Sequence, residues 1–378
     1  MRKNAVWLVM IVLSVLIILV SWKSISRAVE AAILFADMAA GSDASLLKQC
    51  TAAPERTPFA WKMGGRMYRG DFYRPAAPAK AGVLLIPGAA EEGKDDSRLI
   101  AFATSLARVR FLVLVPDLEG IKKLHLQSED TQEVAEFFRV LVESSRAASV
   151  SRYGISAFSY GVGPAILAAL DPTIRHEVNF VMGIGGYYDL PQVLAYATTG
   201  YFLDQGRWRY MPPNDYGKWF FVRSNVHRLS ESSDRSLLRQ IAARKMENSE
   251  ADIGSLADSL GPEGSSVLTF ITNRDPFRAL SLISHLPEAI RDEIADLDLA
   301  TKNLSLLNAR LLLVHGMDDN IVPYTQSVEL ASSVPPGQAD LYLAKGLLHV
   351  DMKGGLVDWW HLWRAVNALL GERDGTRG

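Results

Sequence analysis

The chain has 378 residues, which is long enough for one large α/β domain that carries an insertion. Its 40 Lys and Arg residues nearly balance its 42 Asp and Glu residues, which excludes an extended basic field for nucleic acid and an acidic disordered tail. The single cysteine, Cys50, excludes an internal disulfide and a cysteine metal cluster. These features favour chemistry on a small-molecule substrate.

An apolar run near the N-terminus is the first predicted element. Residues 5–20 contain no charged residue and follow Arg2 and Lys3. A helix of roughly 18 residues is about 27 Å long, just enough to cross a bilayer. No small-residue cleavage site follows directly, so we expect an uncleaved transmembrane anchor over residues 1–23 rather than a removed signal peptide. The numbers of Lys and Arg residues on the two sides of this apolar run are nearly equal, so they favour neither orientation strongly. We expect a single-pass membrane protein with an extracytoplasmic catalytic domain.

A short amphipathic helix and a linker are expected over residues 24–57. Ile25, Val29 and Ile33 recur at helical spacing, which predicts a helix that ends near Ala40. This pattern fits packing on the domain and a role at a lipid surface equally well. Proline-containing polar residues after it favour a linker.

Strands and helices then alternate through residues 58–189, the first part of the predicted core. Gly64 and Gly65 predict the turn of a β-hairpin at its start. Continuous apolar runs suit strands that are buried on both faces of a parallel sheet. The predicted strands are 82–86, 111–115, 150–156 and 178–184, and the predicted helices are 99–109, 131–143 and 162–170. The alternation indicates an α/β fold with a mostly parallel central sheet flanked by helices.

This alternation stops over residues 190–308 and resumes over residues 309–370, the second part of the core. A structureless loop of that length is uncommon and the segment contains helical patterns, so we expect an inserted helical cap. Its aromatic residues suit packing within the cap and, collectively, the lining of an apolar binding cavity. They are Tyr201, Phe202, Trp208, Tyr210, Tyr216, Trp219, Phe220 and Phe221. Residues 371–378 are expected to form a disordered tail.

The turn around Ser159 is the first of three candidate catalytic segments. It lies between a predicted strand and a predicted helix, and the small residues Ala157 and Gly161 would let the two approach closely. A serine held in such a turn is typical of a nucleophile. Because small-x-Ser-x-small patterns are common, the serine also suits a simple helix N-cap.

Two later segments supply what a nucleophilic serine needs, namely a histidine base and a carboxylate that orients it. Residues 315–323, His-Gly-Met-Asp-Asp-Asn-Ile-Val-Pro, place Asp318 and Asp319 in a loop after a predicted strand. His349 follows the last predicted strand. Since parallel strands end at the same edge of a sheet, we expect Ser159, an acid and His349 to meet there.

With these motifs the chain resembles the α/β-hydrolase superfamily. The order serine, acid, histidine is the order of that family, and His-Gly-x-x-Asp-x-x-Val-Pro is among its more specific motifs. The resemblance implies an α/β-hydrolase fold with a triad of Ser159, Asp319 and His349. Asp319 stands at the acid position of the motif and is favoured over Asp318, while Asp189 is a third, less favoured acid.

The family takes its oxyanion donors from two backbone N–H groups, and by resemblance these belong to Ala89 and Tyr160. The chain departs from the family at two nearby positions. Ala157 replaces a more common glycine, and Pro87 replaces a more common histidine. Neither change removes a backbone donor at residue 89 or 160.

A nucleotide site is a competing interpretation of the loop 88–95, which nearly matches G-x-x-x-x-G-K-[ST]. Asp95 replaces the hydroxyl that would hold Mg²⁺, and Glu91 and Glu92 would repel phosphates, so this interpretation is disfavoured. The histidines lack metal-ligand spacing, and His315, before a glycine at a strand end, is expected to be structural. We therefore expect no metal and no cofactor.

The predicted function is that of a membrane-anchored serine hydrolase, a carboxylesterase-like enzyme with an acyl-enzyme intermediate. We expect a small-molecule or lipid-like ester as the substrate, the membrane as a partner through the N-terminal helix, and no nucleic acid. Two alternatives remain open. One is an acyltransferase with the same triad, and the other is a catalytically silent, membrane-tethered binding protein.

Overall fold

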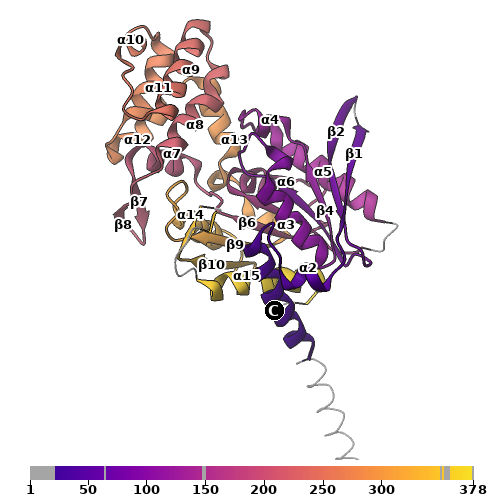
Figure 1. Ribbon diagram of the computed structural model, residues 1–378. Coiled ribbons are helices and arrows are strands. Elements are labelled where there is room, and N and C mark those ends of the chain that lie inside the picture. Colours follow the sequence, from indigo (N-terminus) through magenta and orange to yellow (C-terminus); the bar gives the residue numbers. More distant parts are fainter. Residues whose placement is uncertain (1–21, 64, 147–149, 350, 353–357, 377–378) are drawn as a thin grey trace, which may run out of the picture.

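The computed structural model describes residues 22–63, 65–146, 150–349, 351–352 and 358–376. Its centre is an eight-stranded sheet (Figure 1). The strands are β1 (Glu55–Met63), β2 (Arg66–Arg74), β3 (Ala81–Ile86), β4 (Phe111–Pro116), β5 (Tyr153–Phe158), β6 (Val178–Ile184), β9 (Arg310–Gly316) and β10 (Ala339–Ala344). Their order is β1-β2-β4-β3-β5-β6-β9-β10. The β1–β2 and β2–β4 pairs are antiparallel, and all other pairs of this sheet are parallel.

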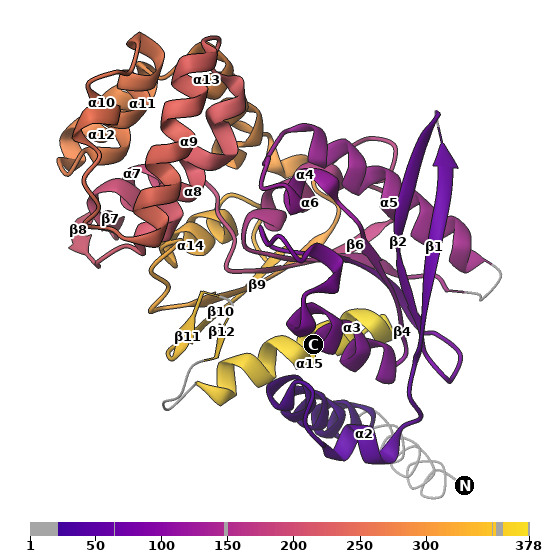
Figure 2. The same cartoon turned by 45° about the horizontal axis from the view of Figure 1, so that its top comes forward.

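Helices cover both faces of the sheet, which explains why its central strands are continuous apolar runs. Every residue of β3 and of β4 is buried. On one face pack α5 (Glu129–Ser145), α6 (Val162–Leu170) and α14 (Thr325–Ser332). On the other pack α3 (Ser97–Arg108), α15 (Trp359–Asp374) and a helix over residues 22–40 (Figure 2). The predicted α/β fold with a mostly parallel sheet is confirmed.

Residues 190–308, between β6 and β9, form a separate group of helices that we call the cap. They comprise α7 (Leu190–Thr199), α8 (Asp215–Asn225), α9 (Ser232–Glu247), α10 (Gly254–Ala257), α11 (Pro262–Thr272), α12 (Pro276–Ser284), α13 (Glu288–Leu297) and a hairpin of β7 (Tyr201–Asp204) and β8 (Arg207–Tyr210). The cap has its own apolar cluster, with Leu238, Phe270 and Ile290 fully buried. It therefore packs as a unit beside the sheet (Figure 1).

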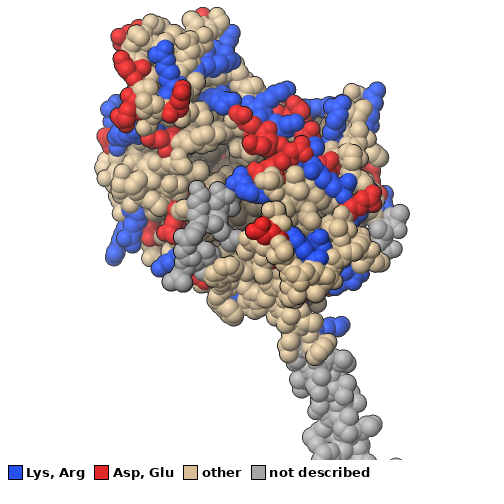
Figure 3. Space-filling model, in the orientation of Figure 1, with Lys and Arg blue, Asp and Glu red and all other residues tan. Residues whose placement is uncertain are grey.

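Small elements complete the described chain. They are α2 (Leu46–Cys50), α4 (Glu119–Lys122), β11 (Leu347–Leu348), β12 (Asp351–Met352) and, among the described residues, five 3-10 helices: Gly93–Asp95, Ser159–Gly161, Val226–Arg228, Leu299–Thr301 and Leu304–Leu306. On the face shown in Figure 3, Lys and Arg side chains are interspersed with Asp and Glu side chains over the described surface. Such a mixture differs from the extended basic surface with which proteins hold a nucleic-acid backbone.

The cap contacts the core through a loop that follows α4. The rings of His125, in this loop, and His227, in the cap, are stacked with centroids 4.5 Å apart. Arg228 donates a hydrogen bond to the carbonyl oxygen of Leu126 at 3.0 Å and forms an ion pair with Glu293 at 2.8 Å. These contacts fix the cap next to the end of the sheet where β3 and β5 terminate.

The helix over residues 22–40 buries only part of the stripe that the sequence suggested: Ile33 packs against the apolar cluster of this face, but the two residues before it in the stripe do not. Ile25 and Val29 are 57% and 54% exposed, whereas Ala31 and Leu34 are fully buried. Two stripes of this helix have apolar residues at helical spacing, and the stripe that contains Ala31 and Leu34 packs against α3 and α15. Periodicity alone does not distinguish them, because the choice depends on which stripe fits the neighbouring helices.

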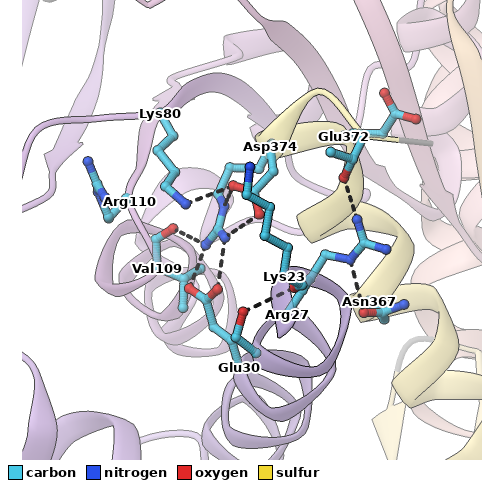
Figure 4. A network of polar contacts seen from close by, with 12 residues as sticks. Lys23, Arg27, Glu30, Lys80, Val109, Arg110, Asn367, Glu372 and Asp374 are labelled. Atoms are coloured by element: carbon cyan, nitrogen blue, oxygen red, sulfur yellow. Dashed lines mark hydrogen bonds and ion pairs between the residues drawn. The ribbon is translucent and has the colours of Figure 1, made fainter. Parts of the chain in front are cut away.

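An ion-pair network joins the two ends of the described chain (Figure 4). The sequence predicted a disordered tail from residue 371, but α15 continues to Asp374. Arg373 is 2% exposed, pairs with Glu30 at 2.5 and 2.8 Å, and donates to the carbonyl oxygen of Val109 at 2.8 Å. These partners are distant in the sequence, so the polar end of α15 resembles a solvated tail when it is considered alone.

The predicted membrane anchor requires a correction. Residues 1–21, nearly all of that segment, lie outside the described residues. In the part of the chain that is described, no helix combines the length and the apolar character that a membrane span needs. A span takes roughly 20 mostly apolar residues, and the helix over residues 22–40 carries charged residues such as Arg27 and Glu30. The predicted single-pass membrane localisation is contradicted by this finding, and we withdraw it.

The stacked histidines at the cap–core contact predict a pH-dependent stability. Burial, together with the charge of Arg228 and neighbouring His125, lowers the pKa of His227 from 6.5 to about 4. Between these two pH values the unfolded chain binds a proton at His227 that the folded protein does not bind, so stability falls as the pH falls. The loss from this group is at most about 1.4 kcal/mol per pH unit.

A His227→Gln variant keeps His125 but has no titrating group at position 227, so it is expected to lose less stability than the wild type between pH 7 and pH 5. Denaturant unfolding at the two pH values measures the difference. An equal loss in both proteins would contradict this account of the contact.

Candidate active site

Ser159 lies directly after β5, in a short 3-10 turn, Ser159–Gly161, that leads into α6. Its φ angle is +51°, in the left-handed region, which for a non-glycine residue costs on the order of 1–3 kcal/mol. Close packing holds the turn. A Cβ atom on Gly161 would lie 2.6 Å from the carbonyl oxygen of Pro87, so only glycine fits. Ala157 is fully buried in β5.

Three of the predicted site residues meet at the carboxyl edge of the sheet. The Nε2 atom of His349 lies 2.7 Å from Oγ of Ser159, and its Nδ1 atom lies 2.8 Å from Oδ2 of Asp319. In the tautomer that carries hydrogen on Nδ1, His349 donates to Asp319 and accepts from Ser159. The three residues follow β5, β9 and β10, and the parallel pairing of the sheet brings the ends of these strands together.

The carboxylate of Asp319 is completely buried and is surrounded by donors. Its Oδ1 atom accepts from the backbone N–H groups of Ile321 at 2.9 Å and Val322 at 3.0 Å. Its Oδ2 atom accepts from His349 and lies 3.2 Å from Nε2 of His315. Burial by itself would raise the pKa of Asp319, but the contacts with His315 and His349 lower the pKa below its usual value. The carboxylate is therefore ionised at neutral pH and can stabilise an imidazolium.

The two other candidate acids have different contacts. Asp318 accepts a hydrogen bond from the backbone N–H of Gly346 at 3.0 Å, and thus braces the loop that carries His349. Asp189 is the N-cap of α7 and accepts from a backbone N–H of its first turn at 2.9 Å. Of the three, Asp319 is the carboxylate that contacts the imidazole.

The two expected oxyanion donors lie beside the nucleophile. Ala89 and Tyr160 both line the cavity that contains Ser159 and His349. Ala89 follows Gly88, where an added Cβ atom would lie 3.5 Å from Cβ of Ser159. The loop after β3 therefore runs close to the reactive oxygen, where backbone N–H groups would be useful to a developing oxyanion.

The loop after β3 also bears on the nucleotide interpretation. Lys94 is held by ion pairs with Asp71 at 3.1 Å and with Asp95 at 3.2 Å. A phosphate-binding loop would direct this lysine at the ligand instead. As for metals, the described residues contain no group of three or more His, Cys, Asp and Glu side chains that could hold an ion.

A cavity of about 250 Å³ opens beside Ser159 and His349, between the core and the cap. The core contributes Tyr187 and Ile321 to its wall, and the cap contributes residues of α7, α8 and α13. The cap-derived part of the wall is largely apolar, with Val193, Leu194, Phe220, Ile294 and Leu297 among its members. The cavity therefore belongs to both parts of the protein.

Three polar residues that the cap contributes to the cavity wall, Glu293, Asn225 and Ser224, have partners in the protein. Glu293 pairs with Arg228, and Oδ1 of Asn225 accepts from Arg228 at 3.1 Å. Ser224 donates to the carbonyl oxygen of Phe221 at 3.1 Å. With its charge paired and its hydrogen bonds made, this wall offers a ligand mainly apolar surface.

The aromatic residues that the sequence singled out in the cap divide into two groups. Tyr216, Phe220 and Phe221 line the cavity. The others do not line it: Trp219 is buried in the apolar cluster of the cap, Phe202 packs against Tyr196, and Tyr201, Trp208 and Tyr210 are exposed on the β7–β8 hairpin. Composition identified the aromatic segment, but only the helical phase of α8 decides which rings reach the cavity.

His315 is a site residue whose role the sequence did not reveal. It is fully buried, its Nδ1 atom lies 2.7 Å from Oγ of Ser327, and its Nε2 atom lies close to both Asp319 and the carbonyl oxygen of Val322. In the tautomer that carries hydrogen on Nε2, Nδ1 accepts from the hydroxyl of Ser327. The sequence places it four residues before Asp319 in the same motif. That spacing could have indicated the role of His315, because residues so close in the chain can place the imidazole next to the carboxylate of Asp319.

No protein-family model matches the sequence, and no curated protein matches it either. Solved structures do match. A Legionella pneumophila protein that is named as a hydrolase is 12% identical, with 85% of this chain and 86% of that chain covered and a TM-score of 0.53. A soluble variant of monoglyceride lipase from Saccharomyces cerevisiae is 14% identical, with 87% and 97% covered and a TM-score of 0.49.

Acylaminoacyl peptidase from Pyrococcus horikoshii is also 14% identical, with 88% of this chain and 43% of that chain covered and a TM-score of 0.45. This chain thus spans less than half the length of the peptidase. The sheet has antiparallel strands at its β1 end and parallel strands elsewhere, with helices on both faces. Together with the similarity to the Legionella structure, this topology shows that the chain has the α/β-hydrolase fold.

Proposed function

We propose that this protein is a serine hydrolase that cleaves carboxylic esters, with Ser159 as nucleophile, His349 as base and Asp319 as the orienting acid. One observation carries the proposal. A continuous chain of contacts runs from Oγ of Ser159 to Nε2 of His349 at 2.7 Å and from Nδ1 of His349 to Asp319 at 2.8 Å. These distances are those of hydrogen bonds along which a proton can move.

In the first half of the reaction, Nε2 of His349 accepts the hydroxyl proton while Oγ of Ser159 attacks the ester carbonyl carbon. The carbonyl oxygen becomes an oxyanion, which accepts hydrogen bonds from the backbone N–H groups of Ala89 and Tyr160. Asp319, ionised because of its donors, stabilises the imidazolium. The bond to the leaving oxygen then breaks, and His349 transfers its proton to the departing alcohol.

In the second half, a water molecule attacks the acyl-enzyme. His349 accepts a proton from this water, a second oxyanion forms at the same donors, and the bond between Ser159 and the acyl carbon breaks. The serine oxygen recovers its proton from His349. The products are a carboxylic acid and the free enzyme.

The cavity supports a neutral substrate with an apolar group. Its cap-side wall is apolar, and the carboxylate of Glu293 is paired with Arg228, so it is not free to select a cationic substrate. Its volume of about 250 Å³ is slightly below the usual ~300–1,000 Å³ of ligand pockets, which favours a small ester or one short arm of a larger ester.

One prediction from the proposed function concerns the nucleophile. A Ser159→Ala variant is expected to lose about 10⁴-fold or more of kcat/KM for ester hydrolysis, because no other group in the chain of contacts can form the acyl-enzyme. Initial-rate measurements with a chromogenic ester provide the readout.

Ser156→Ala is a matched control, since Ser156 is buried in β5, the strand that precedes Ser159, and its hydroxyl has no hydrogen-bond partner among the described residues. It should keep its activity. Retained hydrolysis in Ser159→Ala, with the same substrate and a folded protein, would refute the proposed function.

A further prediction concerns the cavity. Gly217 lines it from the first turn of α8, and an added Cβ atom would meet no other atom within 4 Å. In Gly217→Leu the new side chain should occupy cavity space and lower kcat/KM for long-chain esters by about tenfold or more, while acetyl esters are affected little.

Activity against p-nitrophenyl esters from acetyl to dodecanoyl measures this change. Gly217→Ala is the control and should stabilise α8 by roughly 0.5–1 kcal/mol with little change in chain-length preference. A uniform loss over all chain lengths in Gly217→Leu would show that the cavity does not hold the acyl group.

A further inference from the structure

The side chain of Tyr160 forms contacts that the proposed mechanism does not use. Its hydroxyl donates to Oδ2 of Asp130 at 2.9 Å and accepts from the backbone N–H of Gln127 at 3.1 Å. The carbonyl oxygen of Gln127 is a second acceptor within reach of the hydroxyl, at 3.2 Å. Gln127 lies just before α5, and Asp130 lies in the first turn of α5. The residue directly after the nucleophile is thus tied to a second element of the core.

Asp130 is unusual in its own right. It is completely buried near the N-terminus of α5, and its Oδ1 atom has no hydrogen-bond partner among the residues that the structure describes. An added Cβ atom on Gly120 would lie 2.8 Å from this oxygen. The absence of a side chain at position 120 therefore makes room for the carboxylate of Asp130. Burial raises the pKa of Asp130 to about 7, against the effect of the Tyr160 hydrogen bond. Such a group is unfavourable to bury unless its contacts serve the fold or the site.

The segment that holds Tyr160 is itself fixed from the cap. The backbone N–H of Ser128 donates to Glu293, and Arg228 donates to the carbonyl oxygen of Leu126 at 3.0 Å while it pairs with Glu293. Residues 126–130 are therefore bound to the cap on one side and to Tyr160 on the other. An anchor that is held in this way can resist movement of the turn.

The turn needs such an anchor because Ser159 has a left-handed backbone conformation. A strained residue keeps its conformation only when its surroundings over-determine it. We propose that Asp130 is a positioning residue: by accepting a hydrogen bond from the Tyr160 hydroxyl, it holds the turn so that the N–H of Tyr160 points at the developing oxyanion. This inference rests on the proposed function, in which that N–H group is an oxyanion donor.

Tyr160→Phe tests the inference, because it removes the hydroxyl and keeps the ring and the backbone N–H. We expect kcat for ester hydrolysis to fall about tenfold with KM changed by less than about twofold, since a misdirected donor weakens transition-state binding and leaves substrate binding intact. Asp130→Ala should also lower kcat, but by less than Tyr160→Phe, because the carbonyl oxygen of Gln127 remains as an acceptor for the hydroxyl. The double variant should lose little more than Tyr160→Phe alone, because both changes break the same hydrogen bond.

Tyr153→Phe is the matched control. Tyr153 lies in β5, and its buried hydroxyl donates to the carbonyl oxygen of Val150 at 2.9 Å and accepts from Ser145, at the other end of α5, at 2.9 Å. The control loses an equivalent buried hydroxyl and should show a lower melting temperature with an unchanged kcat. Asp130→Asn keeps an acceptor for Tyr160 and should retain most of the wild-type kcat.

The outcomes separate the inference from the function on which it rests. Wild-type kcat in Tyr160→Phe, or an equal fall of kcat in Tyr160→Phe and Tyr153→Phe, overturns the inference while Ser159-dependent hydrolysis by the wild type leaves the proposed function in place. Wild-type protein that shows no Ser159-dependent hydrolysis overturns both.

Discussion

The buried carboxylate of Asp319 is the interaction on which the proposed chemistry depends. A charge in this position is tolerable only because donors surround it: two backbone N–H groups on one oxygen, and His349 and His315 on the other. These contacts outweigh burial and keep the pKa of the acid low. An ionised acid in turn fixes the tautomer of His349, and that tautomer leaves Nε2 free to accept the proton of Ser159.

The fold supplies this arrangement through the direction of its strands. Because β5, β9 and β10 run parallel, their ends bring together three residues that are far apart in the chain. Close packing at Gly161 then allows the strained turn at Ser159, and the Tyr160 hydroxyl ties that turn to α5. The cap completes the site by closing an apolar cavity over the same strand ends. In the proposed reaction, the core would position the reactive groups and the apolar cap would exclude water from the bound substrate.

Much of this arrangement could be predicted from the sequence, since apolar runs mark the buried strands and the motifs around Ser159, Asp319 and His349 follow them in order. What could not be predicted is tertiary contact between distant residues. The burial of Arg373 against Glu30 and Val109 has no periodic signal in the sequence, so the sequence predicts a disordered tail where α15 in fact continues. The buried stripe of residues 22–40, the aromatic rings that reach the cavity, and the Tyr160–Asp130 bond depend in the same way on partners elsewhere in the chain.

Covalent labelling tests the central claim, that Ser159 is an activated nucleophile, most directly. The folded wild-type protein is treated with a fluorophosphonate, digested and mapped by mass spectrometry, with and without an excess of ester substrate. The account predicts one adduct, on the peptide that contains Ser159, and slower labelling when ester is present, because both reagents need the same serine and the same cavity. Ester hydrolysis by a protein that takes up no adduct, or that carries the adduct on a different residue, would contradict it.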